Sequence, residues 1–99
     1  MARNLLYRLK PDHVLVLDVQ ADLLESLNTR VVVPLLPKSR APTPAAYLNP
    51  IFGWKGEQYV MATQFLAAVS ISQLGDPLGS LDEHFAEITR ALDTLFQGF

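Results

Sequence analysis

The sequence has no cysteine and only two histidines, His13 and His84. A chain without cysteine can form neither a disulfide framework nor a thiolate metal site. The His-Glu-x-x-His zinc motif, the glycine-rich phosphate loop and the nucleophile elbow are also missing. We therefore expect no cofactor and no bound metal, and a reducing compartment suits such a chain.

Long apolar segments are missing as well. No segment approaches the roughly 20 apolar residues that span a membrane, and residues 1–8 contain no apolar run long enough for a signal peptide. The chain is long enough for one small core, and nearly half of its residues are apolar. We expect a single domain over residues 1–99 in a cytoplasmic protein that has no membrane partner.

Negative charge is concentrated in the second half of the chain, although the net charge is only −2. Residues 56–99 contain six acidic residues and a single basic one, Arg90, whereas the other seven basic residues lie in residues 1–55. An acidic segment of this kind repels a phosphate backbone. We therefore expect no direct binding of nucleic acid.

Turn-forming residues divide the chain into short apolar segments. Seven prolines and five glycines favour strands over a helical bundle. Five segments have the β-branched or apolar composition of strands, and a sixth follows a bend: residues 4–8, 14–20, 30–36, 51–54 and 58–63, then 65–71. Because strands come first and one helix comes last, we predict a mostly β (α+β) fold, a small antiparallel five-stranded barrel-like sheet with a C-terminal α-helix.

Two residues and two connections carry further predictions. Pro34 cannot donate a ladder hydrogen bond, so its strand is expected at a sheet edge or with a bulge. Asp18 lies in an apolar strand and requires a hydrogen-bond partner if it is buried. Residues 37–50 contain four prolines and are predicted to form a surface loop. Residues 55–57 are predicted to close a hairpin.

A C-terminal helix is predicted from Ser80 almost to the last residue. Ser80 and Glu83 have the spacing of a capping box. Apolar residues then recur every three or four positions, at Leu81, Phe85, Ile88, Leu92, Leu95 and Phe99. Chain ends are usually polar, so an end with two phenylalanines around Gly98 is unusual. It is either packed against the core or exposed for contact with a partner.

Leu23 and Leu24 form an adjacent apolar pair in a predicted turn. One side chain can pack inward, and the other must point outward or sideways. Singly exposed leucines are common. The pair gains importance if the fold brings it near Phe96 and Phe99, because the four side chains would then form an apolar patch suited to a partner.

The sequence gives little evidence for catalysis. His13 lies in a predicted turn and His84 on the solvated face of the predicted helix. Two histidines nevertheless leave open an acid–base ribonuclease in which Arg3, Arg8 or Lys10 holds phosphate.

Several segments, in their order and spacing, resemble the CcdB toxins of bacterial toxin–antitoxin pairs. These segments are Val19-Gln20-x-Asp22-Leu23-Leu24, Arg30-x-Val32-Val33-Pro34-Leu35, Met61-x-Thr63, Ala67-x-Val69, Ser72, Leu74-Gly75 and Phe96-x-Gly98. The resemblance covers most of the chain and fails in the proline-rich loop. It implies a CcdB/Kid toxin-type barrel with a C-terminal helix, which forms a homodimer in the bacterial cytoplasm.

The resemblance implies a toxin that binds the A subunit of DNA gyrase and poisons this topoisomerase. Such a protein is an enzyme inhibitor and not itself an enzyme. Carried over by position, the gyrase-binding residues are Leu23, Leu24, Asp93, Phe96, Gln97, Gly98 and Phe99. The best-known family members have tryptophan where this chain has Gln97, and glutamine cannot stack on a gyrase arginine as that ring does.

The resemblance also implies neutralisation by a small CcdA-like antitoxin whose disordered segment folds on the toxin. The antitoxin contacts are expected in the first turn and the long loop, at Arg8, Lys10, His13, Lys38, Arg40 and Tyr47. Two alternatives remain open. The chain is also compatible with an mRNA endoribonuclease similar to Kid and MazF, which share the barrel, and with an inert dimeric homologue that binds only its antitoxin.

Overall fold

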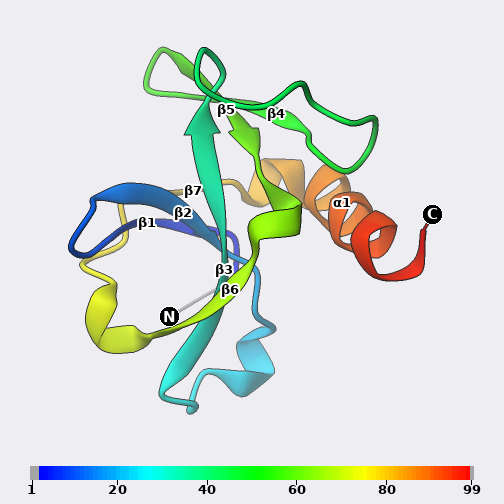
Figure 1. Ribbon diagram of the computed structural model, residues 1–99. Coiled ribbons are helices and arrows are strands. Elements are labelled where there is room, and N and C mark those ends of the chain that lie inside the picture. Colours follow the sequence, from blue (N-terminus) through cyan, green and yellow to red (C-terminus); the bar gives the residue numbers. More distant parts are fainter. Residues whose placement is uncertain (1–2, 99) are drawn as a thin grey trace.

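The computed structural model describes residues 3–98, which form a curled antiparallel sheet with one α-helix at the C-terminal end (Figure 1). The strands among these residues are β1 (Leu5–Leu9), β2 (Val14–Asp18), β3 (Thr29–Pro37), β4 (Ile51–Trp54), β5 (Glu57–Met61), β6 (Ala67–Ser70) and β7 (Gly79–Ser80). The helix α1 spans Phe85–Gln97, and short 3-10 turns lie at η1 (Asp22–Leu24), η2 (Thr63–Phe65), η3 (Ile71–Gln73) and η4 (Asp82–His84). The predicted fold class is confirmed, although the described residues contain seven strands and not five.

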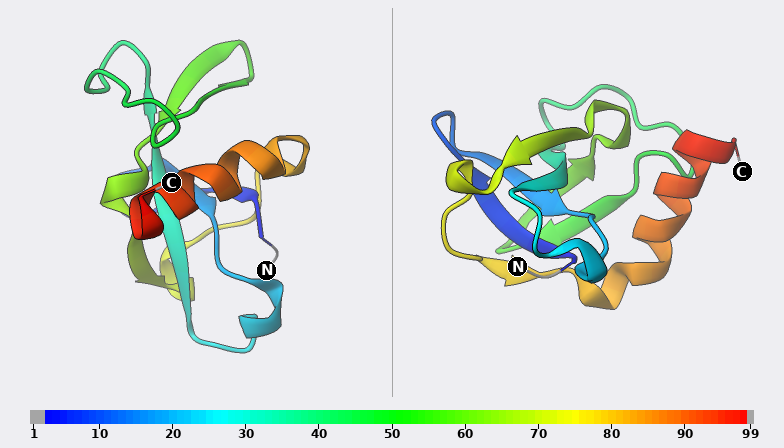
Figure 2. Two further views of the ribbon diagram at one scale, coloured as in Figure 1. Left: turned by 90° about the vertical axis from the view of Figure 1, so that its right-hand side faces the viewer. Right: turned by 90° about the horizontal axis from the view of Figure 1, so that it is seen from below.

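The long strand β3 is the centre around which the sheet curls. The strand order is β4-β5-β3-β2-β1-β7, and β6 also pairs with β3. The first half of β3 pairs with β6 and the second half with β5, so β3 changes partner halfway along one side. The helix α1 lies beside the sheet and ends on the side opposite the β1–β2 turn (Figures 1 and 2).

Pro34 lies in the middle of this central strand, so of the two predicted alternatives, an edge strand or a bulge, the edge strand is wrong. Pro34 is opposite Val16 of β2. On its other side, the pairing with β6 ends at Val32 and the pairing with β5 begins at Leu35. The Pro34 carbonyl accepts a hydrogen bond from the Ala62 backbone N–H on that side, at 2.9 Å. Pro34 therefore lies where β3 changes its partner from β6 to β5, and its missing N–H interrupts the hydrogen bonds of neither pair.

The alternation of side chains across the strands produces two apolar layers. Leu6, Leu17 and Val33 point to one face, where Ile88 and Ala91 of α1 complete the main core. The opposite face carries a smaller cluster of Tyr7, Val16, Val32 and Leu74. The apolar periodicity of the tail thus correctly predicts a helix that packs against the sheet.

No helix within residues 3–98 is long and apolar enough to cross a membrane.

The helix begins later than predicted, and the predicted capping box does not form. The Ser80 hydroxyl accepts a hydrogen bond from the Asp82 N–H at 3.0 Å, but the chain then makes the 3-10 turn η4 before α1 starts at Phe85. Leu81 is the cause, because it is buried and its N–H donates to the Asn4 carbonyl at 2.9 Å. This contact fixes the chain against the start of the first strand, outside the path of a helix.

The hairpin and the long loop agree with the predictions. Lys55 and Gly56 both have positive φ angles, of 49° and 80°, as a two-residue type I′ hairpin turn requires. Residues 38–50 contain no strand or helix.

Asp18 and Arg30 form an ion pair inside the protein, with both side chains fully buried. The Arg30 guanidinium donates from Nε to Asp18 Oδ2 at 2.7 Å and from Nη2 to Oδ1 at 2.9 Å. The bidentate geometry supplies the partner that a buried Asp18 requires. Burial raises the pKa of the nearby Tyr7 hydroxyl above its ordinary value, and the Asp18 carboxylate raises it further, whereas Arg30 acts in the opposite direction.

Candidate active site

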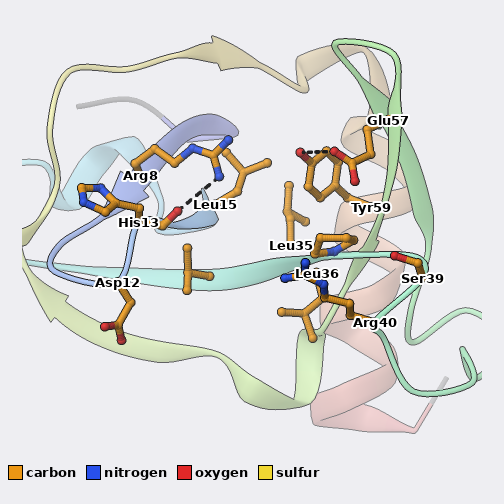
Figure 3. A pocket seen from close by; sticks show the side chains of 12 residues that line it. Arg8, Asp12, His13, Leu15, Leu35, Leu36, Ser39, Arg40, Glu57 and Tyr59 are labelled. Carbon is orange, nitrogen blue, oxygen red and sulfur yellow. Dashed lines mark hydrogen bonds between the residues drawn. The ribbon is translucent and has the colours of Figure 1, made fainter.

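A cleft of about 510 Å³ opens between the β1–β2 turn, the end of β3, the loop that follows β3, and β5 (Figure 3). Leu15 and Leu35 form a buried apolar floor. The polar side chains around it are Arg8, Asp12, His13, Ser39, Arg40, Glu57 and Tyr59. A volume of this size is within the ordinary range of small-molecule and nucleotide sites.

Arg8 and His13 come from the two ends of the β1–β2 turn and are held together by it. The His13 N–H donates to the Leu9 carbonyl at 2.7 Å, which closes the turn. Arg8 Nη1 donates to the His13 carbonyl at 3.2 Å. His13 itself has a positive φ of 61°, in the left-handed region where histidine, asparagine and aspartate are enriched among the residues other than glycine. The turn therefore fixes the His13 backbone and holds the Arg8 guanidinium at the His13 carbonyl, while the imidazole points away from the middle of the cleft in Figure 3.

Arg40 approaches the cleft from the opposite wall. Its N–H donates to the Pro37 carbonyl at 2.8 Å, and the preceding Lys38 N–H donates to the Gln58 carbonyl at 3.0 Å. These bonds make a turn directly after β3 and attach it to β5. The guanidinium groups of Arg8 and Arg40 both point toward the middle of the cleft in Figure 3. Two arginines on opposite walls suit a ligand that carries a phosphate.

Glu57 and Tyr59 complete the wall formed by β5. The Tyr59 hydroxyl donates to Glu57 Oε2 at 3.2 Å, and the tyrosine ring is buried. Residues two apart in a strand face the same side of the sheet, so the buried ring anchors the exposed carboxylate. The second carboxylate oxygen of Glu57 accepts no hydrogen bond from the described residues.

The side chains that line the cleft are of the types that bind a phosphate and exchange protons. The cleft combines two guanidinium groups with an imidazole and a carboxylate, which are the usual groups for general acid–base catalysis at a phosphate. Among residues 3–98 no group of three or more histidine, cysteine or acidic side chains could hold a metal ion.

The structure unites half of the residues predicted to bind an antitoxin. Arg8, His13 and Arg40 line the cleft, whereas the other three residues of that set, Lys10, Lys38 and Tyr47, are exposed outside its lining. The sequence does not indicate Glu57 and Tyr59 as cleft residues, because Glu57 is predicted to lie in a hairpin turn and Tyr59 in the core. Their spacing of two in a strand was the available signal.

The residues predicted to bind gyrase do not form one patch within the subunit. Leu23 and Leu24 in η1 are 90% and 43% exposed, so both side chains are accessible to a partner. Phe96, Asp93 and Gln97 are exposed on α1. The end of α1 and η1 lie apart in both figures of the fold (Figures 1 and 2). Gly98, with φ of 81°, ends the helix in the left-handed conformation, and Phe99 lies outside the described residues.

A curled antiparallel sheet with one C-terminal helix is the fold that the resemblance to the CcdB family implies. The chain belongs to the CcdB family, because residues 4–98 match the family described as CcdB protein. The expected fold type and family are therefore confirmed. A search of the curated proteins finds no match.

Two solved structures share the fold across nearly the whole chain. One is an endoribonuclease from a mycobacterial species, with a TM-score of 0.79 and 20% sequence identity, which covers 97% of this chain and 90% of its own. The other is an endoribonuclease in complex with its cognate antitoxin, also from a mycobacterial species, with a TM-score of 0.79, 20% identity, and coverage of 97% of this chain and 94% of its own.

These structures overturn the expectation that the protein is an enzyme inhibitor and not an enzyme. Both similar proteins carry the name of an RNA-cleaving enzyme. The inference failed because it transferred the activity of well-known family members to a chain that lacks their tryptophan, while the residues of the cleft are dispersed in the sequence.

Proposed function

We propose that the protein is the toxin of a toxin–antitoxin pair and that it cleaves RNA in the cleft. The observation that carries the proposal is the convergence of Arg8, His13, Arg40 and Glu57 from three separate parts of the chain. The endoribonuclease names of two proteins with the same fold support it. The acidic residues of α1 do not oppose RNA binding, because none of them lines the cleft.

The cleft residues divide into phosphate-binding and proton-transfer groups. The guanidinium groups of Arg8 and Arg40 bind the scissile phosphate and stabilise the negative charge that grows on it in the transition state. A base takes the proton of the ribose 2′-hydroxyl, whose oxygen attacks the adjacent phosphorus, and an acid protonates the departing 5′-oxygen. We assign His13 and Glu57 as this acid–base pair, with the His13 imidazole turned from its position in Figure 3 toward the bound phosphate.

The test is incubation of the purified chain with defined single-stranded RNAs and mapping of the new 5′ ends. We expect discrete products from the wild type and none from an Arg8→Ala/Arg40→Ala variant purified in the same way, which controls for contaminating nucleases. A folded wild-type protein that leaves every RNA intact contradicts the proposal.

We also propose that the cognate antitoxin acts by covering this cleft. Arg8, His13 and Arg40, where the family resemblance implies antitoxin contacts, are also the residues that would hold RNA. An acidic antitoxin segment that places a carboxylate between the two arginines would exclude the phosphate. The antitoxin is then expected to suppress cleavage competitively, and its association rate should fall as salt concentration rises. Inhibition that persists undiminished at saturating RNA would contradict a shared site.

A second candidate function is binding of the gyrase A subunit by the end of α1, in a homodimer that brings two helix ends together. The exposure of Phe96, 70% of its surface, favours this surface as a contact site. Phe96→Ala should weaken binding to the gyrase A subunit by about 2 kcal/mol, roughly thirtyfold. Phe85→Ala is the control, since Phe85 is 50% exposed at the other end of the same helix. Equal losses in both variants, measured by calorimetry, would remove the helix end as a specific site.

A further inference from the structure

The loop that supplies Arg40 to the cleft is attached to α1 at its other end. The Arg90 guanidinium lies over the Tyr47 ring, with its carbon 3.5 Å from the ring centre. Arg90 is the only basic residue in residues 56–99, and it is used for this contact. Tyr47 has a positive φ of 65°, which a bulky residue adopts only when its surroundings impose it. The stack on Arg90 is such a tertiary restraint.

Hydrogen bonds fasten the same end of the loop to the body of the protein. Asn49 accepts from the Ala45 N–H at 3.1 Å and donates to the Met61 carbonyl at 3.0 Å. The Thr63 hydroxyl donates to the Leu48 carbonyl. Residues 45–49 therefore form a fixed turn between η2 and α1. The other end of the loop is fixed by the Arg40 and Lys38 bonds described above.

Residues 40–47, which we name the proline strap, connect these two anchored ends. Residues 41–44 make no hydrogen bond to any other described residue. Their conformation is restricted instead by Pro42 and Pro44, because proline fixes its own φ and confines the residue before it to extended conformations. Proline-rich segments of this kind behave as semi-rigid spacers and not as flexible coils. The stack of Tyr47 on Arg90 is therefore one of the contacts that set where the strap ends, together with the hydrogen bonds of residues 45–49.

We propose that Arg90 and Tyr47 are positioning residues that hold the Arg40 guanidinium in the cleft through the proline strap. Neither residue lines the cleft. The claim that the Tyr47–Arg90 stack anchors the loop does not depend on any reaction, whereas the claim that it affects RNA cleavage rests on the proposed function. Two measurements therefore separate the failure of one from the failure of the other.

The first measurement is the rate at which trypsin cuts the chain after Lys38 and Arg40, followed by mass spectrometry. Tyr47→Ala and Arg90→Ala should each be cut about two- to fivefold faster than the wild type, the range that an exposed cation–π pair supports. Tyr47→Phe keeps the ring and should be cut at the wild-type rate. The melting temperatures should stay alike, since the loop opens without unfolding the sheet. Equal cutting rates in all variants would overturn the proposal, whether or not the protein cleaves RNA.

The second measurement is a double-mutant cycle on RNA cleavage. Tyr47→Ala and Arg40→Ala should both raise KM, because both weaken or remove the contact between the Arg40 guanidinium and the RNA phosphate. The Arg40→Ala/Tyr47→Ala variant should be no worse than Arg40→Ala alone, since Tyr47 acts through Arg40. A Pro42→Gly/Pro44→Gly variant should reproduce the Tyr47→Ala effect with the Arg90 stack intact. Independent, multiplying losses from Arg40 and Tyr47 would overturn the proposal.

Discussion

Replacing His13 with asparagine is expected to slow RNA cleavage by about 10²- to 10⁴-fold, the usual contribution of a positioned acid or base. Asparagine is the appropriate substitution because His13 has a φ of 61°. Asparagine tolerates the left-handed conformation better than most residues, so the turn should keep its shape while the imidazole is lost. The measurement is the single-turnover rate of cleavage of a labelled RNA at saturating enzyme.

His84→Asn provides the matched control, since His84 is the only other histidine of the chain. It lies in η4, where its Nδ1 is 3.0 Å from Glu87 Oε1 and its ring is next to Phe52, outside the lining of the cleft. We expect His84→Asn to cleave within about twofold of the wild-type rate, because it removes no group that reaches the phosphate. Comparable losses in the two variants would assign the effect to folding and contradict the catalytic role of His13.

Replacing Asp18 with asparagine is expected to destabilise the protein by about 3–5 kcal/mol, the cost of leaving a buried charge without its partner. Asparagine has nearly the same shape, so the loss comes from the charge and not from a cavity. The Arg30 guanidinium is fully buried and cannot turn to water. A loss of this size is a large part of the roughly 5–15 kcal/mol that stabilises an ordinary domain. Urea unfolding followed by Trp54 fluorescence measures it as a lower midpoint with an unchanged slope.

The double variant Asp18→Leu/Arg30→Met is the control for this prediction. Removal of both charges leaves no unpaired ion in the interior, so the double variant should be more stable than Asp18→Asn. If the double variant were less stable than both the wild type and Asp18→Asn, the loss of stability would come from removing the ion pair itself and not from leaving the Arg30 charge unpaired.

The sequence predicts the strands of this fold well, because their signal is local. Alternating and β-branched residues mark β1, β2 and β3, and the Lys55-Gly56 pair marks the hairpin between β4 and β5. The position of Pro34 in a central strand could not be predicted in this way. It depends on β3 changing partner from β6 to β5, and strand partners are chosen by tertiary packing and not by the residues of the strand itself.

Nonlocal pairing also explains what the sequence does not predict about the polar residues. Asp18 clearly requires a partner, but Arg30 becomes that partner only because β2 and β3 pair with Asp18 opposite Val32. Arg8 and Arg40 meet across the cleft because the sheet curls between β1 and the loop after β3. Each residue taken alone resembles an ordinary surface charge, so the cleft could be recognised only from the fold.

The helix end illustrates the opposite case, in which the sequence signal is strong but its meaning is not fixed. Two phenylalanines around Gly98 indicate either a helix end packed against the core or an exposed contact surface, and Phe96 is exposed. Exposure shows that a partner can reach the residue but does not identify the partner. The convergent polar groups of the cleft indicate a chemistry, and they therefore carry the assignment of function.

The most direct test of the account compares the cleft with the helix end in one assay. RNA cleavage is measured for the wild type, Arg40→Ala and Phe96→Ala, with equal folding of the three proteins verified by their melting curves. We predict that Arg40→Ala loses at least about tenfold in kcat/KM, since an arginine–phosphate contact is lost, and that Phe96→Ala cleaves as the wild type does. Cleavage that survives in Arg40→Ala and disappears in Phe96→Ala would contradict the central claim that the cleft performs the reaction.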